Sequence, residues 1–210
     1  AGTINYSGTG AFNQLNSNTF SSSGTLNITS GIWDSYGNQA FNGPIVMSAG
    51  TQFRVQSGGT TSLNAGSSIG GTGTFALTGG TLNQVPAWSI STHTVQINSG
   101  VWNTTGGVTF GNAQSYTWSG GTLAGAGGFT VAIGSSLVVN NAAKTLNTTL
   151  TNNGTMAWSA GGISGSGSIQ NNVGGTFNIS ISGVNILSAN STNAGTINYS
   201  GTGAFNQLNS

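Results

Sequence analysis

The chain has almost no charge. Its 210 residues include two basic and one acidic residue, and 1% of all residues are charged, whereas an ordinary soluble domain carries about 25%. With a net charge of +1, nothing attracts the chain to nucleic acid, so we expect no nucleic-acid partner. A nearly neutral surface is a poor design for a free cytosolic monomer. It suits a polymer whose surface is covered or which is insoluble.

Cysteine and long apolar runs are also missing. Without cysteine, neither a disulfide framework nor thiol chemistry is available. No apolar run approaches the roughly 18 residues that cross a bilayer, so we expect no membrane span. The N-terminus lacks the basic and apolar regions of a secretion signal. Because the chain starts in the middle of its sequence pattern, this last absence says nothing about export.

Paired carboxylates and metal-ligand clusters are absent too. Asp34 is the one acidic residue and His93 the one histidine. Lyases and hydrolases on β-helices need two carboxylates, or a base with a metal, and calcium-binding solenoids need recurring Asp. We therefore expect no catalytic residues, no cofactor and no metal, and interpret the chain as a non-enzyme.

The single histidine and the three charged residues are each expected to have a structural role. We expect His93 on an outer strand face and Asp34 in a turn. Arg54 lies between two apolar residues, so alternation turns it outward. Lys144 follows a loop-like segment, 140–143, and is expected to be a solvated charge.

Apolar residues are nevertheless plentiful, at 35% of the chain, with 9% aromatic. They alternate with Thr, Asn, Ser and Gln, which is the pattern of strands with one buried face. The alternating sets are Ile4/Tyr6, Leu26/Ile28, Phe53/Val55, Phe75/Leu77, Trp88/Ile90, Val95/Ile97, Tyr116/Trp118, Phe129/Val131/Ile133, Met156/Trp158 and Phe177/Ile179/Ile181. Glycine interrupts every window that is long enough for a helix. The sequence predicts an all-β fold with almost no helix.

Two glycine motifs indicate where strands begin and where corners lie. Gly-Thr before an apolar residue occurs at Gly2, Gly24, Gly80, Gly121, Gly154, Gly175 and Gly195. Several intervals are close to twenty residues, typical of one solenoid turn, so we expect coils of about 19–23 residues. The interval of 33 from Gly121 to Gly154 indicates an irregular or differently started coil.

The second glycine motif is apolar-x-Gly-x-Gly-x-apolar. It starts at Tyr6, Ile69, Leu123, Ile163 and Tyr199. A phosphate-binding loop would need a third glycine at fixed spacing and a following helix, and neither is visible. We interpret the motif as a tight corner between two short strands.

The chain also repeats itself. Residues 1–17, AGTINYSGTGAFNQLNS, return unchanged as residues 194–210. We interpret residues 1–193 as one tandem unit of nine or ten coils and residues 194–210 as the start of the next, identical unit. A duplicated edge or a capping tail are the alternatives. In a continuous array both copies should have the same conformation and lie on the same face, and one unit should advance the axis by about 43–48 Å.

A second, weaker duplication lies inside the unit. Seven residues recur 69 positions further on. They are Leu26, Ile28, Gly31, Ile32, Trp33, Gly37 and Phe41, which return as Val95, Ile97, Gly100, Val101, Trp102, Gly106 and Phe110.

Three segments resemble the Gly/Thr/Asn-rich strand repeats of very large bacterial surface proteins. They are GGTLAGAGGF (residues 120–129), TNNGTM (151–156) and SAGGISGSGSI (159–169). Their composition and repeat pattern are similar to those of autotransporter passenger domains and filamentous-haemagglutinin-type adhesins, and this similarity covers nearly the whole chain. The resemblance implies a right-handed parallel β-helix that is exported and used as a stalk, adhesin or matrix fibre. The near absence of Asp and Lys and the long identity between units depart from typical members and favour a repetitive structural polymer.

Two functions remain open. The first is a structural repeat of an extracellular or cell-surface β-solenoid filament, sheath or stalk, whose partners are further copies in the same chain or in neighbouring filaments. Backbone ladders and apolar stacking would make its cohesion insensitive to salt and pH. The second is an adhesin shaft or a glycan-binding module. Trp33 follows Ile32 and Trp102 follows Val101, so one member of each pair must face outward. Two interpretations remain open for the five tryptophans, which are core side chains or exposed platforms for polysaccharide or neighbouring fibrils. Under the second interpretation, we expect Trp33 and Trp102 to be the exposed aromatic contacts.

Overall fold

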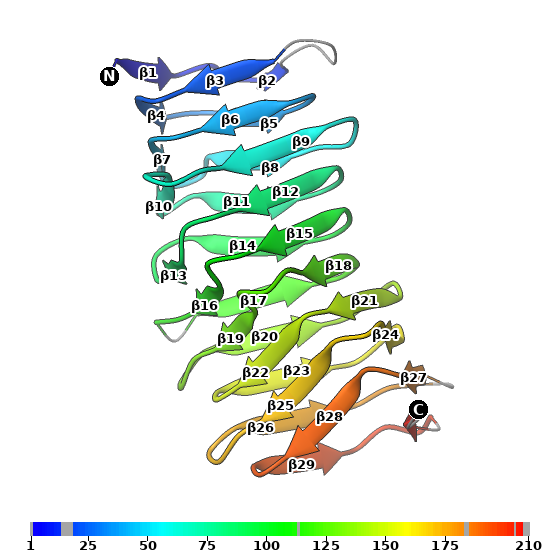
Figure 1. The fold of residues 1–210 in the computed structure, drawn as a ribbon. Coiled ribbons are helices and arrows are strands. Elements are labelled where there is room, and N and C mark those ends of the chain that lie inside the picture. The colour runs from blue at the N-terminus through cyan, green and yellow to red at the C-terminus, as the bar shows by residue number, and fades with distance from the viewer. Residues whose placement is uncertain (1, 14–18, 113, 183–184, 204, 208–210) are drawn as a thin grey trace.

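Parallel strands stacked turn upon turn make up the fold. The structure is a computed structural model that describes residues 2–13, 19–112, 114–182, 185–203 and 205–207, and it contains no helix in those ranges (Figure 1). Apart from the step between β10 (Ser68–Gly71) and β13 (Trp88–Ile90), each strand pairs with the strand three places further along the chain, and every pairing is parallel. The chain is therefore a three-sided β-solenoid of about nine turns, as the alternating pattern predicts.

Side 1 carries two sheets in succession. Sheet 1 contains β1 (Thr3–Tyr6), β4 (Thr25–Ile28), β7 (Pro44–Met47) and β10 (Ser68–Gly71). Sheet 4 contains β13 (Trp88–Ile90), β16 (Val108–Phe110), β19 (Phe129–Val131), β22 (Thr149–Asn152), β25 (Ser168–Asn171) and β28 (Asn190–Asn193). β10 and β13 are not paired, so side 1 is broken between the fourth and fifth turns, where the ribbons change direction in Figure 1.

Sides 2 and 3 are each one unbroken sheet. Sheet 2 contains β2 (Ala11–Asn13), β5 (Ile32–Ser35), β8 (Gln52–Val55), β11 (Thr74–Leu77), β14 (Thr94–Ile97), β17 (Ser115–Trp118), β20 (Ser136–Val139), β23 (Thr155–Trp158), β26 (Thr176–Ile179) and β29 (Thr196–Tyr199). Sheet 3 contains β3 (Phe20–Ser22), β6 (Gln39–Phe41), β9 (Thr60–Leu63), β12 (Thr81–Gln84), β15 (Val101–Thr104), β18 (Gly121–Ala124), β21 (Lys144–Asn147), β24 (Ile163–Ser164), β27 (Asn185–Leu187) and β30 (Phe205–Gln207).

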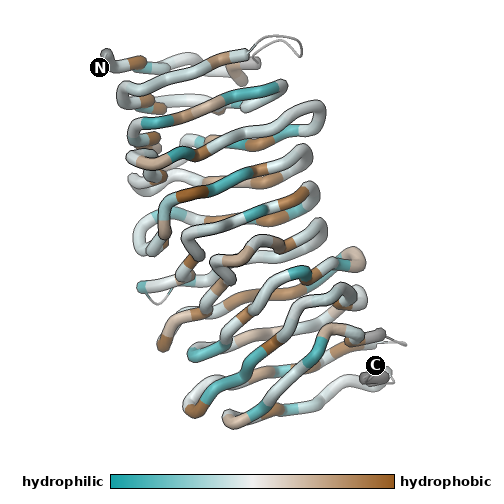
Figure 2. Tube along the Cα trace, in the orientation of Figure 1, coloured by the Kyte–Doolittle hydropathy of each residue, from teal (hydrophilic) through white to brown (hydrophobic). Residues whose placement is uncertain are grey.

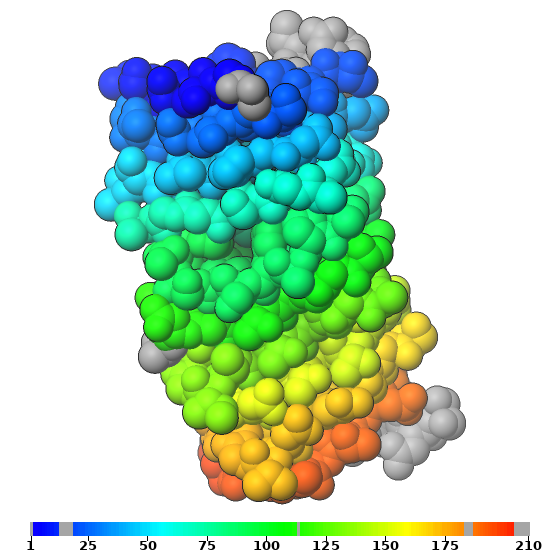
Figure 3. Space-filling model, turned by 60° about the vertical axis from the view of Figure 1, so that its left-hand side comes forward, coloured from blue at the N-terminus to red at the C-terminus, as the bar shows by residue number. Residues whose placement is uncertain are grey.

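Successive strands of a side are separated by a nearly constant number of residues. On side 2 the step ranges from 19 residues, from Ser136 to Thr155, to 22, from Gln52 to Thr74. The longest step, 24 residues, occurs from Pro44 to Ser68 on side 1 and from Ile163 to Leu187 on side 3. In the space-filling view the turns form successive bands from blue to red, each lying on the next (Figure 3).

Both glycine motifs lie where they were predicted. Thr3, Thr25, Thr81, Thr155, Thr176 and Thr196, each preceded by glycine, are the first residues of their strands. The apolar-x-Gly-x-Gly-x-apolar segments all form corners between consecutive strands. Gly71 shows why glycine is needed: its φ is +92° and an added Cβ would collide with the backbone of Met47 in the adjacent turn.

The irregular interval from Gly121 to Gly154 has a simple cause. Gly121 begins β18 on side 3, whereas Gly154 precedes β23 on side 2. The Gly-Thr start therefore moves to another side, and the coils between keep their length. The expectation of an irregular coil is wrong, and that of a differently started one is confirmed.

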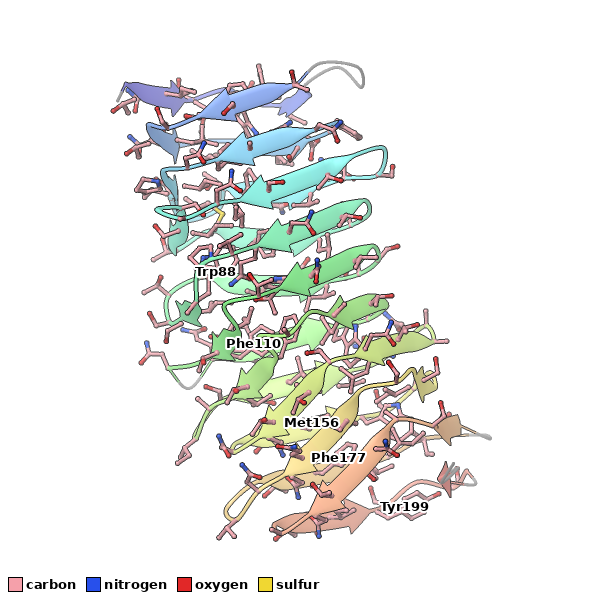
Figure 4. The ribbon with its side chains drawn as sticks, in the orientation of Figure 1. Trp88, Phe110, Met156, Phe177 and Tyr199 are labelled. Atoms are coloured by element: carbon pink, nitrogen blue, oxygen red, sulfur yellow. The ribbon has the colours of Figure 1, made fainter. Side chains whose placement is uncertain are left out.

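The core is a continuous column of aromatic and aliphatic side chains between the three sides. Trp102 lies at the centre of several aromatic contacts. Its ring centroid is 5.3–6.4 Å from the ring centroids of Phe75, Trp88, Phe110 and Phe129. Most of these pairs are edge-to-face, the geometry that aromatic quadrupoles favour. Figure 4 shows Trp88, Phe110, Met156 and Phe177 along this column. Figure 2 shows apolar positions in brown interspersed with neutral and polar positions throughout the stack.

Asparagine ladders connect neighbouring turns. Side-chain amides donate to an amide oxygen of an adjacent turn at 2.7–3.1 Å in the pairs Asn5–Asn27, Asn42–Asn64, Asn83–Asn103, Asn152–Asn171, Asn171–Asn193, Asn153–Asn172 and Asn178–Asn198. An amide offers both a donor and an acceptor, so one residue type can continue such a ladder indefinitely.

Where both copies of the 17-residue segment are described, they form the same local elements but lie at different positions in the solenoid. Each forms a strand, a corner and a second strand, and Tyr6 Oη donates to Gly10 O as Tyr199 Oη does to Gly203 O. However, β1 lies on side 1 and β29 lies on side 2. The expectation that both copies share one face is therefore wrong.

Candidate functional site

Asp34 and Arg54 form an ion pair on the outer surface of side 2. They occupy paired positions of β5 and β8, and Arg54 donates to both carboxylate oxygens at 2.6 Å. Gln56 Nε2 donates to Asp34 Oδ1 at 3.0 Å, and the carboxylate is buried beneath these partners. The hydrogen bond to Asp34 raises the pKa of the Arg54 guanidinium. Arg54 faces outward as predicted; the turn assignment of Asp34 is wrong, because it belongs to a strand.

Lys144 is inside the solenoid. It begins β21 and its side chain is 1% exposed. Its Nζ donates to the backbone oxygens of Ala142, at 2.6 Å, and Ala160, at 3.1 Å. Burial lowers the pKa of this ammonium from 10.5 to about 8. The expectation of a solvated charge is wrong, because Lys144 has the same strand parity as the buried Leu146.

His93 is also buried, at 2% exposure. It lies in the corner between β13 and β14, next to the break in side 1. Neither ring nitrogen has a hydrogen-bond partner, nor does Nε1 of the nearby Trp88. Burial lowers the pKa of His93 from 6.5 to about 4. The expected position on an outer face is wrong, because His93 shares the inward parity of Val95 and Ile97.

These positions leave the outer surface without an isolated charge. The chain has three formally charged side chains. Asp34 and Arg54 neutralise each other, and Lys144 is enclosed. The surface that solvent or a neighbour meets is therefore built from amides, hydroxyls and backbone.

The tryptophans are not exposed contacts. Trp33 is 3% exposed and Trp102 is fully buried. The outward members of the two pairs are Ile32 and Val101, which are partly exposed. Buried glutamines satisfy both indoles: Trp33 Nε1 donates to Gln39 and Trp102 Nε1 to Gln84. The expectation that Trp33 and Trp102 face outward is wrong.

The two most exposed apolar side chains lie at corners instead. Ile133 is 84% exposed and Val173 83% exposed. Both lie in corners that lead from side 1 to side 2, after β19 and β25 respectively. Ile133 was expected to continue the buried alternation of β19, but the strand ends at Val131.

Hollows lie on the surface of the described residues at both ends of the solenoid and along one corner. A shallow one of about 270 Å³ lies over the start of side 3, around Phe20 and Gln39. A polar one of about 390 Å³ follows the corner between sides 3 and 1, around Asn147 and Ser166. Another, of about 160 Å³, is apolar and lies at the last turns, lined by Phe177, Ile197 and their neighbours.

Within the described residues, no cluster of three or more His, Cys, Asp or Glu side chains is placed to hold a metal ion. The same residues contain no helix of the length and hydropathy that crossing a membrane requires. No family model, curated protein or solved structure matches this chain.

Proposed function

We propose that this chain is a structural repeat of an extracellular β-solenoid filament, sheath or stalk. One observation carries the proposal: the second copy of the 17-residue segment continues the stack. β29 pairs with β26 over four residues, from Thr176↔Thr196 to Ile179↔Tyr199, and β30 pairs with β27. The backbone ladder thus passes from one repeat into the next without a linker.

The uncharged surface and the ladders support this role. A filament places identical surfaces side by side at high local concentration, and like charges on such surfaces would repel. Here the outer amides and hydroxyls carry no net charge, and the asparagine ladders join turn to turn. The extracellular placement rests on the resemblance to bacterial surface repeats and on the absence of the charge that keeps free cytosolic proteins soluble.

The alternative role, a glycan-binding adhesin shaft, has less support. Its basis was a set of exposed tryptophans, and Trp33 and Trp102 are buried. Stacking on a sugar ring needs an accessible aromatic face, which these two residues lack.

Tandem chains of one, two and four 193-residue units test the proposal. Nine to ten turns at about 4.8 Å each give about 45 Å per unit. Electron microscopy should therefore show unbranched rods whose length grows by that increment. A matched control with a flexible Gly/Ser linker at each junction should give kinked rods. If the uninterrupted chains are equally kinked, the filament proposal fails.

A further inference from the structure

Both duplications in this chain advance the sequence by one side of the solenoid. In the 69-residue duplication, Trp33 lies in β5 on side 2 and its counterpart Trp102 in β15 on side 3. Phe41, in β6 on side 3, returns as Phe110, in β16 on side 1. All four side chains are buried in the core. The same pattern therefore packs equally well on different sides.

The 193-residue repeat shows the same shift. On side 2, Thr196 stacks nine turns after Ala11 through the successive strand pairings. Its sequence counterpart is Thr3, which lies one strand earlier, on side 1. The repeat therefore exceeds nine turns by the step from β1 to β2. It contains 28 strands, β1 to β28, which is nine and a third turns, and β29 begins the next repeat.

The physical basis is that a strand with its corner is the common module of all three sides. Ten strands separate β5 from β15 and 28 separate β1 from β29, so each module averages about 6.9 residues in both duplications. Each module presents its inward residues with the same period of two. Parallel backbone ladders are also alike on every side. Nothing in such a module specifies which side it occupies.

We propose that successive 193-residue repeats are rotated by one side about the filament axis, so that three repeats restore the starting orientation. This proposal rests on the proposed tandem filament. The rotation concerns the interface between one repeat and the next copy. β29 is the counterpart of β1, so the next copy's equivalent of β4 would pair with β29 on side 2, whereas β4 itself pairs with β1 on side 1. The apolar hollow around Phe177 and Ile197 lies at this junction.

The rotation determines how a filament meets its neighbours. Each repeat carries two corner tips that are more than four-fifths exposed, Ile133 and Val173. With one-side rotation, these tips point in three directions along the filament. The partner this arrangement fits is a set of neighbouring filaments around the first, as in a sheath or bundle, with contacts recurring every 28 turns, about 134 Å.

Labelled tandem chains test the rotation. The chain has no cysteine, so Gln96→Cys, on the exposed outer face of β14, gives one gold label per unit. In a six-unit chain, labels of consecutive units should lie on successive sides, and the fourth should return to the side of the first after correction for steady twist. Labels at Gln96→Cys and Asn178→Cys within one unit, both on side 2, calibrate that twist. Labels that keep to one side throughout would overturn the proposal.

A crosslinking experiment on the 210-residue chain separates the rotation from filament formation. Asn5 and Asn198 are the same residue of the two copies, and they face Asn27 on side 1 and Asn178 on side 2 respectively. A short bifunctional thiol reagent should join Asn5→Cys to Asn27→Cys and Asn198→Cys to Asn178→Cys with comparable yield. Asn198→Cys paired with Gln170→Cys on side 1 is the control and should give at least tenfold less product. If the control pair reacts preferentially, the rotation proposal is wrong, even where tandem chains form rods. If the tandem chains kink while the two predicted pairs are crosslinked, only the filament proposal fails.

Discussion

Replacing Lys144 by methionine should remove a large part of the pH dependence of stability. The ammonium is 1% exposed and its described partners are the carbonyl oxygens of Ala142 and Ala160. No anion neutralises it, because the one acidic residue, Asp34, pairs with Arg54. A buried ammonium without an anionic partner destabilises the folded state.

The magnitude follows from the lowered pKa. The change from 10.5 to about 8 corresponds to about 3 kcal/mol. Between those two pH values the unfolded chain binds a proton that the folded chain does not, so the free energy of unfolding rises with pH. The destabilisation of the fold by the buried Lys144 ammonium is therefore complete below pH 8 and vanishes above pH 10.5. Lys144→Met should therefore stabilise the fold at pH 7 by about 2 kcal/mol, since orphaning the carbonyl of Ala142 costs about 1 kcal/mol.

Denaturant unfolding between pH 7 and 9.5 measures this effect. The upper limit avoids Tyr116, whose pKa burial raises above 10 and whose ionisation destabilises the fold there. The double variant Lys144→Met/Thr145→Lys is the matched control, because it moves the same charge to the outer face of β21. Both variants should lose the slope that the parent shows. The reasoning is refuted if all three chains show the same slope, or if Lys144→Met is less stable than the parent at pH 7.

Two further predictions concern the other ionisable groups. Because the pKa of His93 is lowered to about 4, stability should be complete above pH 6.5 and fall by about 3 kcal/mol as the pH drops to 4; His93→Leu should flatten this profile in denaturant titrations, and an unchanged profile would contradict the burial argument. Asp34→Asn should cost about 1–3 kcal/mol, because Arg54 loses its bidentate partner but is partly exposed to solvent. Adding Arg54→Gln should recover part of that loss in a double-mutant cycle, whereas strictly additive costs would show that the pair contributes no coupling.

The strand pattern was predictable because its signals are local. Alternation, Gly-Thr strand starts and Gly-x-Gly corners each depend on a few neighbouring residues, and they proved correct except at Ile133, which lies beyond the end of β19. Which side a strand occupies is not local, since it requires counting every strand from a reference point. A corner of two residues and one of four look alike in a sequence without an alignment. For this reason the coil length was predicted correctly, but the face of the second 17-residue copy was not.

The misplaced polar residues failed for a different reason. Lys144 precedes Thr145 and Leu146, and His93 precedes Thr94 and Val95, so period-two alternation already places both among the inward positions. The polarity of both side chains favours an outward position, whereas their parity in the strand requires an inward one. The parity argument prevails here because the backbone ladder fixes the side-chain direction of a whole strand, and one unfavourable residue cannot reverse it without turning its apolar neighbours into solvent.

Because the backbone ladders hold the turns together, the solenoid is weakest where a ladder is interrupted. Stability in a stacked fold is approximately a sum of turn and interface contributions. On side 1, β10 and β13 do not pair, and the adjoining Trp88 and His93 have unsatisfied buried nitrogens. Protonation of His93 would add an unpaired charge where the ladder is already interrupted, whereas sides 2 and 3 remain continuous through these turns. Acid should therefore open the fold first between the fourth and fifth turns, and the pH insensitivity expected of continuous ladders does not extend to this break.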